Sequence, residues 1–581
     1  MSKRNYYQAY EGRDDLKKFK SNSLSLFALE LKFGIEDIES VALNSISEGP
    51  DDKKIDLVYI DAENGTAVIT QSYLSEKEKK EAPANKASDL NTAVSWLINS
   101  PEEKLPEGLR SHAQELRTAL KEGQIETLHL WYVHNLNESE NVNNELKIVE
   151  QTANNALVNL LGKSHNIDIR SLEIGNTVLE EWYQSLLSPV LISDKFEIPV
   201  KGGFEIKESD WSAYITTVSA NWLGNQFKKY GSTKILSANV REYLGSRNAD
   251  KNINQGIQKT VIHDPSHFCV FNNGITALVN GYEIDEKKQT LIISGLSIVN
   301  GAQTAGAIGT AKSKIKDTAL IQIRFIKCSN VKTVQGVVRY NNSQNKITAP
   351  DFRSNDLIQR RLVKEFLKIK NVTYLNRRGG DTEFIKRRSN SIPSITAGQI
   401  LAAFHGDPDS AYNKKTHIWE SDGLYSKFFN EKTTARHIYF VYALMGAIEK
   451  KKLELFGKKE KNTITKFEVQ QLSFFRERGS IVLFLSAIAS SLEIILDSRL
   501  PNTFSLGFKS NPTLDKAVEI WDPIVQSLSA FTKPLAEGLT DGIKNKQKIN
   551  SALEDFQGFV DSTKKSNEKI FVTFKSETKQ N

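Results

Sequence analysis

The sequence contains little cysteine, no signal-like N-terminus and no strong excess of either charge. Its 581 residues include two cysteines, Cys269 and Cys328, too few for a disulfide-stapled scaffold or a cysteine-rich zinc module. The polar N-terminus lacks the apolar core of a signal peptide. Free cysteines and a chain without an export signal predict a cytoplasmic protein.

Long apolar runs are also absent. The longest, Ser480–Leu496, is interrupted by Glu493 and is too short to cross a bilayer, so it predicts a buried helix and no membrane partner. The 77 basic and 70 acidic residues give a net charge of +7, which permits DNA or RNA as a partner without demonstrating one. Hydrophobic residues at 39% and charged residues at 25% are ordinary for a soluble chain of roughly three or four domains.

Three parts with different sequence character predict a multidomain α/β protein. Residues 1–190 alternate helix and strand patterns, which predicts an α/β domain with a mixed sheet. Residues 211–405 are rich in Asn, Gly and Gln and have short strand patterns, including 267–278, which predicts an α+β domain. Residues 406–581 are expected to be helical, with fraying from Ser562 onward. The connector 189–210 is either a linker or an edge strand with a turn.

Two polar residues lie on a predicted N-terminal hairpin. Asn64-Gly65 between apolar runs indicates a tight turn joining the strands 55–60 and 66–73. This hairpin places Asp56 and Gln71 on adjacent antiparallel strands. A metal-dependent phosphodiesterase needs a carboxylate and a second oxygen ligand side by side to hold Mg²⁺. Asp56 and Gln71 are therefore candidate metal ligands.

This segment resembles the restriction-endonuclease-like core, in which a Lys follows two positions after the second strand residue. The resemblance implies catalytic roles for Asp56 and Gln71, with Glu30 from the preceding helix in support. It departs at Tyr73, which occupies the Lys position, and Lys86 is a candidate replacement ammonium. The alternative is an inactive or purely binding core with ordinary polar strand residues. The intervening loop is expected to carry solvated lysines: Lys77, Lys79 and Lys80.

Amide and small residues gather at a predicted strand–turn–helix junction in the central part. The turn is Asn300-Gly301, and the helix is expected over 302–310. Free N–H groups and the helix dipole at such a junction receive anions, and amide side chains suit nucleotides or base edges. Ordinary turn and cap roles are the alternative for any single residue. The candidates for binding nucleic acid or a nucleotide are Asn272, Asn273, Asn300, Gly301, Gln303 and Thr304.

Arginines cluster after these motifs. Arg beside Gly and Tyr374 suits phosphate contacts, so this cluster predicts nucleic-acid binding, with a solvated face as the alternative. The candidate residues are Arg377, Arg378, Arg387 and Arg388.

Four motifs occur in order across residues 232–401: NVREYLG at 239–245, FNNGI at 271–275, IVNGAQT at 298–304 and YNNSQNKI at 340–347. In them the chain resembles the bacterial abortive-infection phage-resistance (AIPR) proteins. The IVNGAQT turn is also similar to the phosphate-binding turn of ParB-type partition proteins, whose relatives bind nucleotides or DNA. The family resemblance implies antiphage defence, with a phage component, a co-encoded defence protein or a second copy as candidate partners.

The sequence therefore predicts an antiphage, Mg²⁺-dependent nuclease that acts on DNA and carries a central nucleic-acid- or nucleotide-binding domain. One alternative is a non-enzymatic sensor or adaptor that controls a partner effector. Another is a nucleotide-binding switch.

Overall fold

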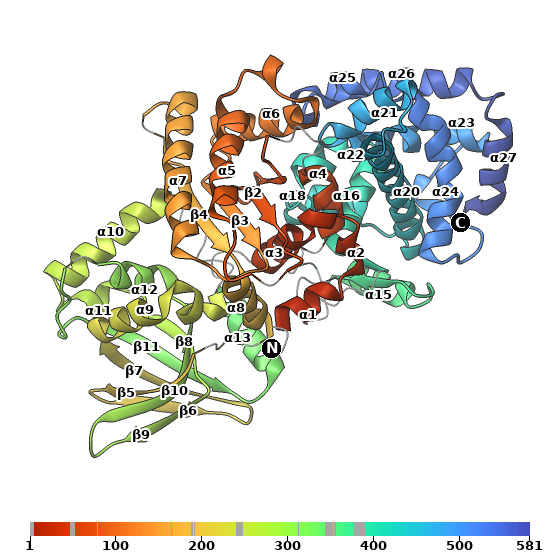
Figure 1. Ribbon diagram of the computed structural model, residues 1–581. Helices are drawn as coiled ribbons and strands as arrows, with labels where there is room; N and C mark the ends of the chain where they lie inside the picture. The colour runs from red at the N-terminus through yellow and green to blue at the C-terminus, as the bar shows by residue number, and fades with distance from the viewer. Residues whose placement is uncertain are drawn as a thin grey trace.

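The computed structural model describes residues 5–35, 37–46, 53–77, 79–163, 165–187, 190, 192–239, 248–311, 313–342, 353, 356–376 and 390–580. It is a mixed α/β structure with an N-terminal sheet, a central sheet and a helical C-terminal part. The N-terminal part lies between the other two (Figure 1).

The N-terminal sheet has the predicted mixed topology. Strands β1 and β2 are antiparallel, whereas β2, β3 and β4 are parallel to one another. Gly65, at φ 67°, lies in the hairpin turn that Asn64-Gly65 predicted. The four strands lie in chain order across the sheet: β1 (Leu57–Asp61), β2 (Thr66–Tyr73), β3 (Thr127–His134) and β4 (Asp168–Ile174).

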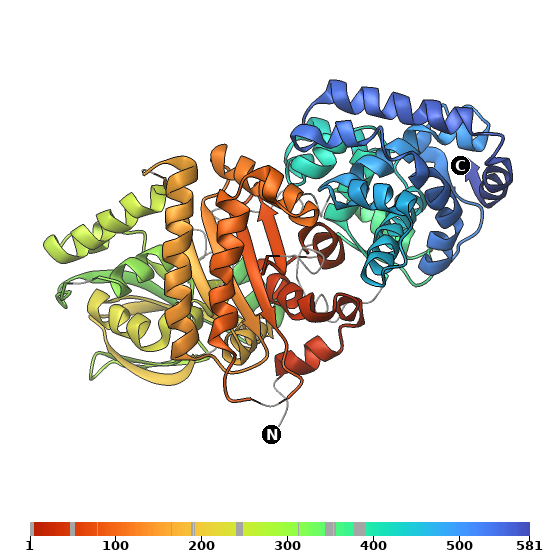
Figure 2. The same ribbon diagram turned by 45° about the horizontal axis from the view of Figure 1, so that its top comes forward.

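Helices cover both faces of this sheet because successive side chains along its strands point into two different hydrophobic cores. Val58 and Ile69 belong to the core beneath one layer of helices, while Leu57 and Val68 belong to the core on the other face. Figure 2 shows two helices of the first layer, α5 and α7, side by side. That layer comprises α5 (Ala84–Val94), α6 (Glu107–Lys121) and α7 (Glu140–Leu161). The other face carries α1 (Asn5–Glu11), α2 (Asp14–Lys17), α3 (Ser23–Phe33), α4 (Ile38–Ser45) and α8 (Asn176–Leu187).

The central sheet begins in the segment that separates the first two parts. Residues 192–207 form two of its strands, which confirms the edge-strand alternative. The order is β5-β10-β8-β11-β7-β6, and β9 pairs with β10. The strands are β5 (Ile192–Pro199), β6 (Gly203–Lys207), β7 (Trp211–Ser219), β8 (Ile275–Leu278), β9 (Gly281–Asp285), β10 (Thr290–Asn300) and β11 (Leu320–Cys328). The helices are α9 (Ala220–Ile235), α10 (Asn248–His263), α11 (Phe268–Phe271), α12 (Ala302–Gly309) and α13 (Val331–Asn342).

One predicted strand is partly wrong. The segment 267–278 is extended only from Ile275, and its first half forms the short helix α11. Phe268 is buried whereas Val270 and Phe271 are exposed, so one apolar run serves a helical turn and a loop. A short apolar run does not distinguish a buried strand from a buried helical turn.

Helices dominate the C-terminal part, as predicted. The apolar segment 480–496 forms the buried helices α22 and α23, and no helix in the described ranges is long and apolar enough to span a membrane. Two helices N-terminal to the predicted boundary at residue 405, α15 and α16, pack against α20 and α22. The helices are α15 (Leu357–Phe366), α16 (Ser394–Phe404), α17 (Pro408–Asn413), α18 (His417–Glu420), α19 (Asp422–Phe428), α20 (Ala435–Glu460), α21 (Lys466–Arg476), α22 (Ser480–Ser490), α23 (Leu492–Leu496), α24 (Leu514–Leu528), α25 (Ala536–Leu539), α26 (Lys546–Ser562) and α27 (Glu568–Glu577).

The expected fraying after Ser562 is wrong. Helix α27 buries Phe571 and Phe574 in the C-terminal core. The last strand, β15 (Thr578–Gln580), pairs with β14 (Leu506–Phe508), while β12 (Thr373–Leu375) pairs with β13 (Ser391–Pro393). Aromatic burial and strand pairing therefore hold the end of the described chain.

The N-terminal and C-terminal parts share one hydrophobic core, which contains Trp131 from β3 and Phe440 from α20. Arg478 reinforces this junction from a largely buried position. Its Nε lies 2.5 Å from the Glu115 carboxylate on α6, and its Nη1 donates to the Val58 carbonyl on β1 at 3.3 Å. The helical part therefore contacts the edge strand of the N-terminal sheet directly.

A pair of carboxyl groups meets at the same junction. Ser40 Oγ lies 3.1 Å from Asp37 Oδ2 and 2.8 Å from Glu449 Oε1 on α20, and Thr396 Oγ1 donates to Asp37 Oδ2 at 2.9 Å. One hydroxyl proton cannot serve two carboxylates, so a protonated Glu449 completes the arrangement. Burial, followed by the charge of Asp37, raises the pKa of Glu449 to about 8.

Because the pKa of Glu449 is raised, we expect the stability of the fold to depend on pH. A carboxyl whose pKa is higher in the folded state stabilises the fold fully below its ordinary value of 4.5, and the contribution is lost as the pH rises toward 8. Glu449→Gln should remove that loss, worth at most about 1.4 kcal/mol per pH unit in this window. Thermal unfolding from pH 5 to pH 8 measures it: the melting temperature of the variant should rise relative to wild type. The exposed Glu554→Gln on α26 is the control. Parallel profiles for wild type and Glu449→Gln would contradict the assignment.

Candidate functional site

The hairpin register brings Asp56 and Gln71 together. Leu57 pairs with Thr70, and the Asp56 N–H donates to the Thr70 carbonyl at 3.1 Å, so Asp56 stands opposite Gln71. Gln71 Nε2 donates to Asp56 Oδ2 at 2.7 Å, and the Ser72 N–H donates to the same oxygen at 2.5 Å. The two predicted metal ligands are thus neighbours at one end of the sheet.

Gln71 keeps an unsatisfied oxygen in this pair. Its side chain is 6% exposed, and its buried Oε1 has no hydrogen-bond partner in the described part of the chain. Leaving a buried acceptor without a partner costs about 1–3 kcal/mol. A carboxylate beside an unsatisfied amide oxygen fits Mg²⁺, which takes one or two protein oxygens and keeps several waters. Among the described residues, no group of three or more His, Cys, Asp or Glu side chains is suited to a metal ion.

An ammonium group contacts the side chain of Tyr73, the residue two positions after Gln71. Tyr73 follows Gln71 by two residues, and Lys79 Nζ lies 2.7 Å from its hydroxyl oxygen and 5.3 Å from its ring centroid. The hydrogen bond from Lys79 lowers the pKa of Tyr73. The sequence predicted Lys79 to be only a solvated loop residue. Its position on Tyr73 depends on how the loop folds back, which residue spacing does not reveal.

The other two predicted catalytic residues have different partners. Lys86 lies in the first turn of α5, and its Nζ is 3.6 Å from the Asp89 carboxylate. Its charge also contributes, after the hydrogen bond from Lys79, to the lowered pKa of Tyr73. Glu30 is fully buried on α3, which packs against the other face of the sheet, and it forms an ion pair with Arg13.

Two family-like motifs meet around the first turn of α12. Gly301, at φ 91°, is the N-cap of α12, and within the described ranges no side chain caps this end of the helix. Asn272 Nδ2 donates to Thr304 Oγ1 at 3.2 Å, while its Oδ1 accepts from the Gly274 N–H at 3.0 Å. The predicted strand–turn–helix junction is therefore formed, with FNNGI folded against IVNGAQT.

A third motif reaches the same cluster from α13. Asn300 Nδ2 donates to the Asn341 carbonyl at 2.6 Å. Arg324 Nη2 on β11 donates to Asn341 Oδ1 at 2.9 Å and to Thr276 Oγ1 at 2.8 Å. Sequence reasoning missed Arg324, although an Arg inside an apolar strand was a usable indication.

The remaining candidates divide between exposed and undescribed positions. Asn273 and Gln303 are exposed beside the turn. Residues outside the described ranges include most of NVREYLG, the end of YNNSQNKI and the four candidate arginines, Arg377, Arg378, Arg387 and Arg388.

A cavity of about 2310 Å³ lies at the junction of the parts. Its lining draws on the N-terminal sheet, the C-terminal helices and Gln303 from the central part. Eleven carboxyl groups and seven Lys or Arg side chains line it, so most of its surface is unsuited to a polyanion such as DNA.

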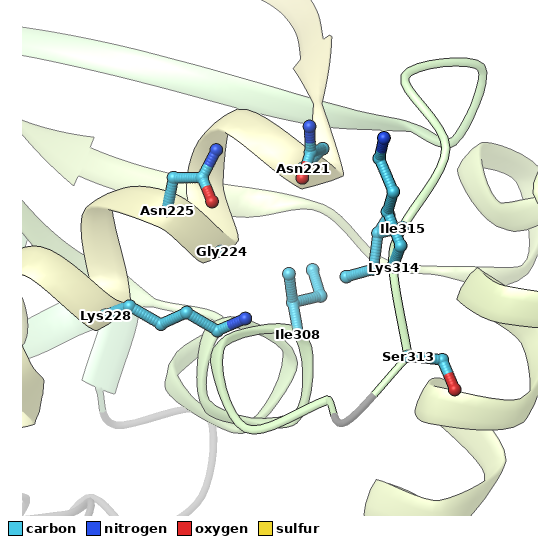
Figure 3. A pocket seen from close by; sticks show the side chains of 8 residues that line it. All are labelled: Asn221, Gly224, Asn225, Lys228, Ile308, Ser313, Lys314 and Ile315. Carbon is cyan, nitrogen blue, oxygen red and sulfur yellow. The ribbon is translucent and has the colours of Figure 1, made fainter.

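A second, smaller pocket of about 450 Å³ lies beside α9 and the end of α12 (Figure 3). Figure 3 shows the Lys228 side chain extending toward Ile308, near the C-terminal end of α12. Lys228 and Lys314 are both exposed, and Asn221 is occupied by a hydrogen bond to Asp317 at 3.0 Å. This pocket therefore presents two exposed lysines and lies at the end of α12 opposite the Gly301 turn.

Comparison with known proteins gives one finding. A family model described as AIPR protein matches residues 236–572, more than half of the chain. No curated protein and no solved structure matches the chain.

The geometry of the Gly301 turn predicts that adding a side chain at this position destabilises the strand–turn–helix junction. Its positive φ costs an L-residue about 1–2 kcal/mol, and an added Cβ would lie 2.8 Å from Ile275 Cγ1 and 3.0 Å from the Gly274 carbonyl. Gly301→Ala should therefore destabilise the junction, with faster hydrogen–deuterium exchange in β8 and β10. Gly256→Ala in α10 is the control, because a Cβ there meets nothing within 4 Å. Unchanged exchange in Gly301→Ala would show that the turn is not constrained as described.

Proposed function

The chain belongs to the AIPR protein family, and we propose that it is a Mg²⁺-dependent nuclease acting on DNA. The family is one of abortive-infection defence against phage. The observation that carries the nuclease proposal is the Asp56–Gln71 pair, a carboxylate beside a buried amide oxygen without a hydrogen-bond partner among the described residues.

The residues around this pair suit phosphodiester hydrolysis. Asp56 and Gln71 would hold the cation, which supplies an activated water and offsets phosphate charge when bound. The Tyr73 hydroxyl, bonded to the Lys79 ammonium, would face the phosphate where the endonuclease-like core uses Lys. Lys86 adds positive charge near that hydroxyl. The carboxylate, the amide oxygen and the cationic groups would together form the proposed site.

The central part would bind nucleic acid or a nucleotide. The support is the α12 N-terminus, which has no side-chain cap, together with three motifs gathered around it. Asn272, Asn300 and Thr304 shape the turn through their hydrogen bonds, whereas Asn273 and Gln303 are exposed for ligand contact. Gly301 allows the backbone to approach a phosphate closely. Arg377, Arg378, Arg387 and Arg388 are proposed backbone contacts for the nucleic acid.

A second candidate function is a non-enzymatic sensor or adaptor that controls a partner effector. The observation favouring it is that Tyr73 replaces the expected Lys, while Glu30 and Lys86 are paired with Arg13 and Asp89. In that case the N-terminal part would bind without cutting.

A plasmid-cutting assay separates the two functions. With Mg²⁺ the wild-type protein should nick or linearise plasmid DNA, and EDTA should stop the reaction. Asp56→Asn should lower the rate at least about 100-fold, since a metal ligand contributes several kcal/mol to the transition state. Lys79→Met should lower the rate less. Asp61→Asn is the matched control, because Asp61 lies at the other end of β1 and bonds to Asn64.

Two outcomes would count against the nuclease. Cutting at the wild-type rate by Asp56→Asn would exclude the metal site. Failure of the wild-type protein to cut, even in extract from phage-infected cells, would favour the adaptor.

A further inference from the structure

Lys32 is a buried lysine with no acidic partner among the described residues. It lies on α3 with 5% of its surface exposed, and its Nζ is 4.6 Å from the Trp182 ring centroid. Within the described part of the chain its ammonium makes no hydrogen bond or ion pair. An ammonium removed from water without a counter-charge is expensive, so its burial calls for a compensating group.

The charged groups that act on Lys32 do not compensate it. Burial, and then the charge of Arg170, lower the pKa of Lys32 to about 7. His129, 3% exposed, has its pKa lowered to about 3 by burial and then by the charges of Arg170 and Lys32. Arg170 in turn bonds Asp168 at 2.7 Å. A bound anion beside Lys32 would favour its charged form.

Lys32 and His129 line the large cavity, and so does Gln303. Gln303 belongs to the first turn of α12, whose leading N–H groups have no side-chain cap. Two aromatic side chains that are half-buried, Phe33 and Tyr59, line the cavity too. A buried lysine, a residue from the first turn of α12 and two aromatic side chains thus line one space.

The charges on the rest of the cavity lining limit the size of an anionic ligand. Because carboxyl groups outnumber Lys and Arg side chains around this cavity, most of its lining would repel a long polyanion. A small anion that contacts only the Lys32 end of the cavity avoids the repulsion.

We propose that this end of the cavity binds a free nucleotide. Its phosphates lie between Lys32 and the first turn of α12, and its base packs on Phe33 and Tyr59. The inference deepens the proposed role of the central turn and rests on it. The nucleotide would contact both α3, which packs on the N-terminal sheet, and the AIPR motifs around the Gly301 turn. Its binding would therefore couple the N-terminal part to the central part.

The test uses the full-length protein without Mg²⁺, so that the Asp56 site does not contribute. Melting temperature and calorimetric affinity are measured with ATP, GTP, CTP, UTP and inorganic pyrophosphate. At least one nucleotide should raise the melting temperature of wild type, and Lys32→Met should weaken its binding at least about tenfold. Without ligand, Lys32→Met should be as stable as wild type or more so, because a buried, uncompensated charge has been removed. Exposed Lys121→Met is the control.

Three outcomes would overturn the proposal. No shift with any of these ligands would exclude the site, and equal affinity in wild type and Lys32→Met would exclude Lys32. A shift through Lys32 with a 5′-phosphorylated oligonucleotide, but with no free nucleotide, would exclude the nucleotide as ligand. Gln303→Ala tests the central turn separately. If Gln303→Ala keeps its affinity for the nucleotide while Lys32→Met loses it, Lys32 belongs to the site and the first turn of α12 does not. Plasmid cutting is scored independently, so either proposal can fail alone.

Discussion

The antiparallel register of β1 and β2 is the constraint on which the candidate site depends. Pairing Leu57 with Thr70 places Asp56 opposite Gln71, on the side of the sheet that faces α5. A slip of one residue would send the two side chains to opposite faces. Two differently packed faces prevent that slip, because Leu57 and Val58 belong to separate cores.

The same hairpin ties the site to the rest of the chain. Arg478 from the helical part bonds the carbonyl of Val58, two residues after Asp56, and pairs with Glu115. From the other side, α3 carries Lys32 into the cavity that Gln303 also lines. The helical part and the cavity therefore both contact the hairpin that carries the proposed metal site.

Local features could be predicted from the sequence. Asn64-Gly65 and period-two alternation gave the hairpin, and Asn300-Gly301 before small residues gave the α12 junction, because turn chemistry is set by neighbouring residues. Features made by distant segments could not. The bond from Arg324 to Asn341 and the burial of Lys32 against Trp182 both depend on packing. The C-terminal end is polar in sequence, yet Phe574 and the pairing of β15 with β14 hold it in place.

The most direct measurement is a crystal structure of the protein grown with Mn²⁺ in place of Mg²⁺, with anomalous scattering recorded for the metal. We expect an anomalous peak between the Asp56 carboxylate and Gln71 Oε1, with both oxygens at about 2.0–2.3 Å from the ion. The peak should disappear in Asp56→Asn. Gln71 Nε2 still donating to Asp56, with no peak beside them at saturating Mn²⁺, would contradict the proposed metal site.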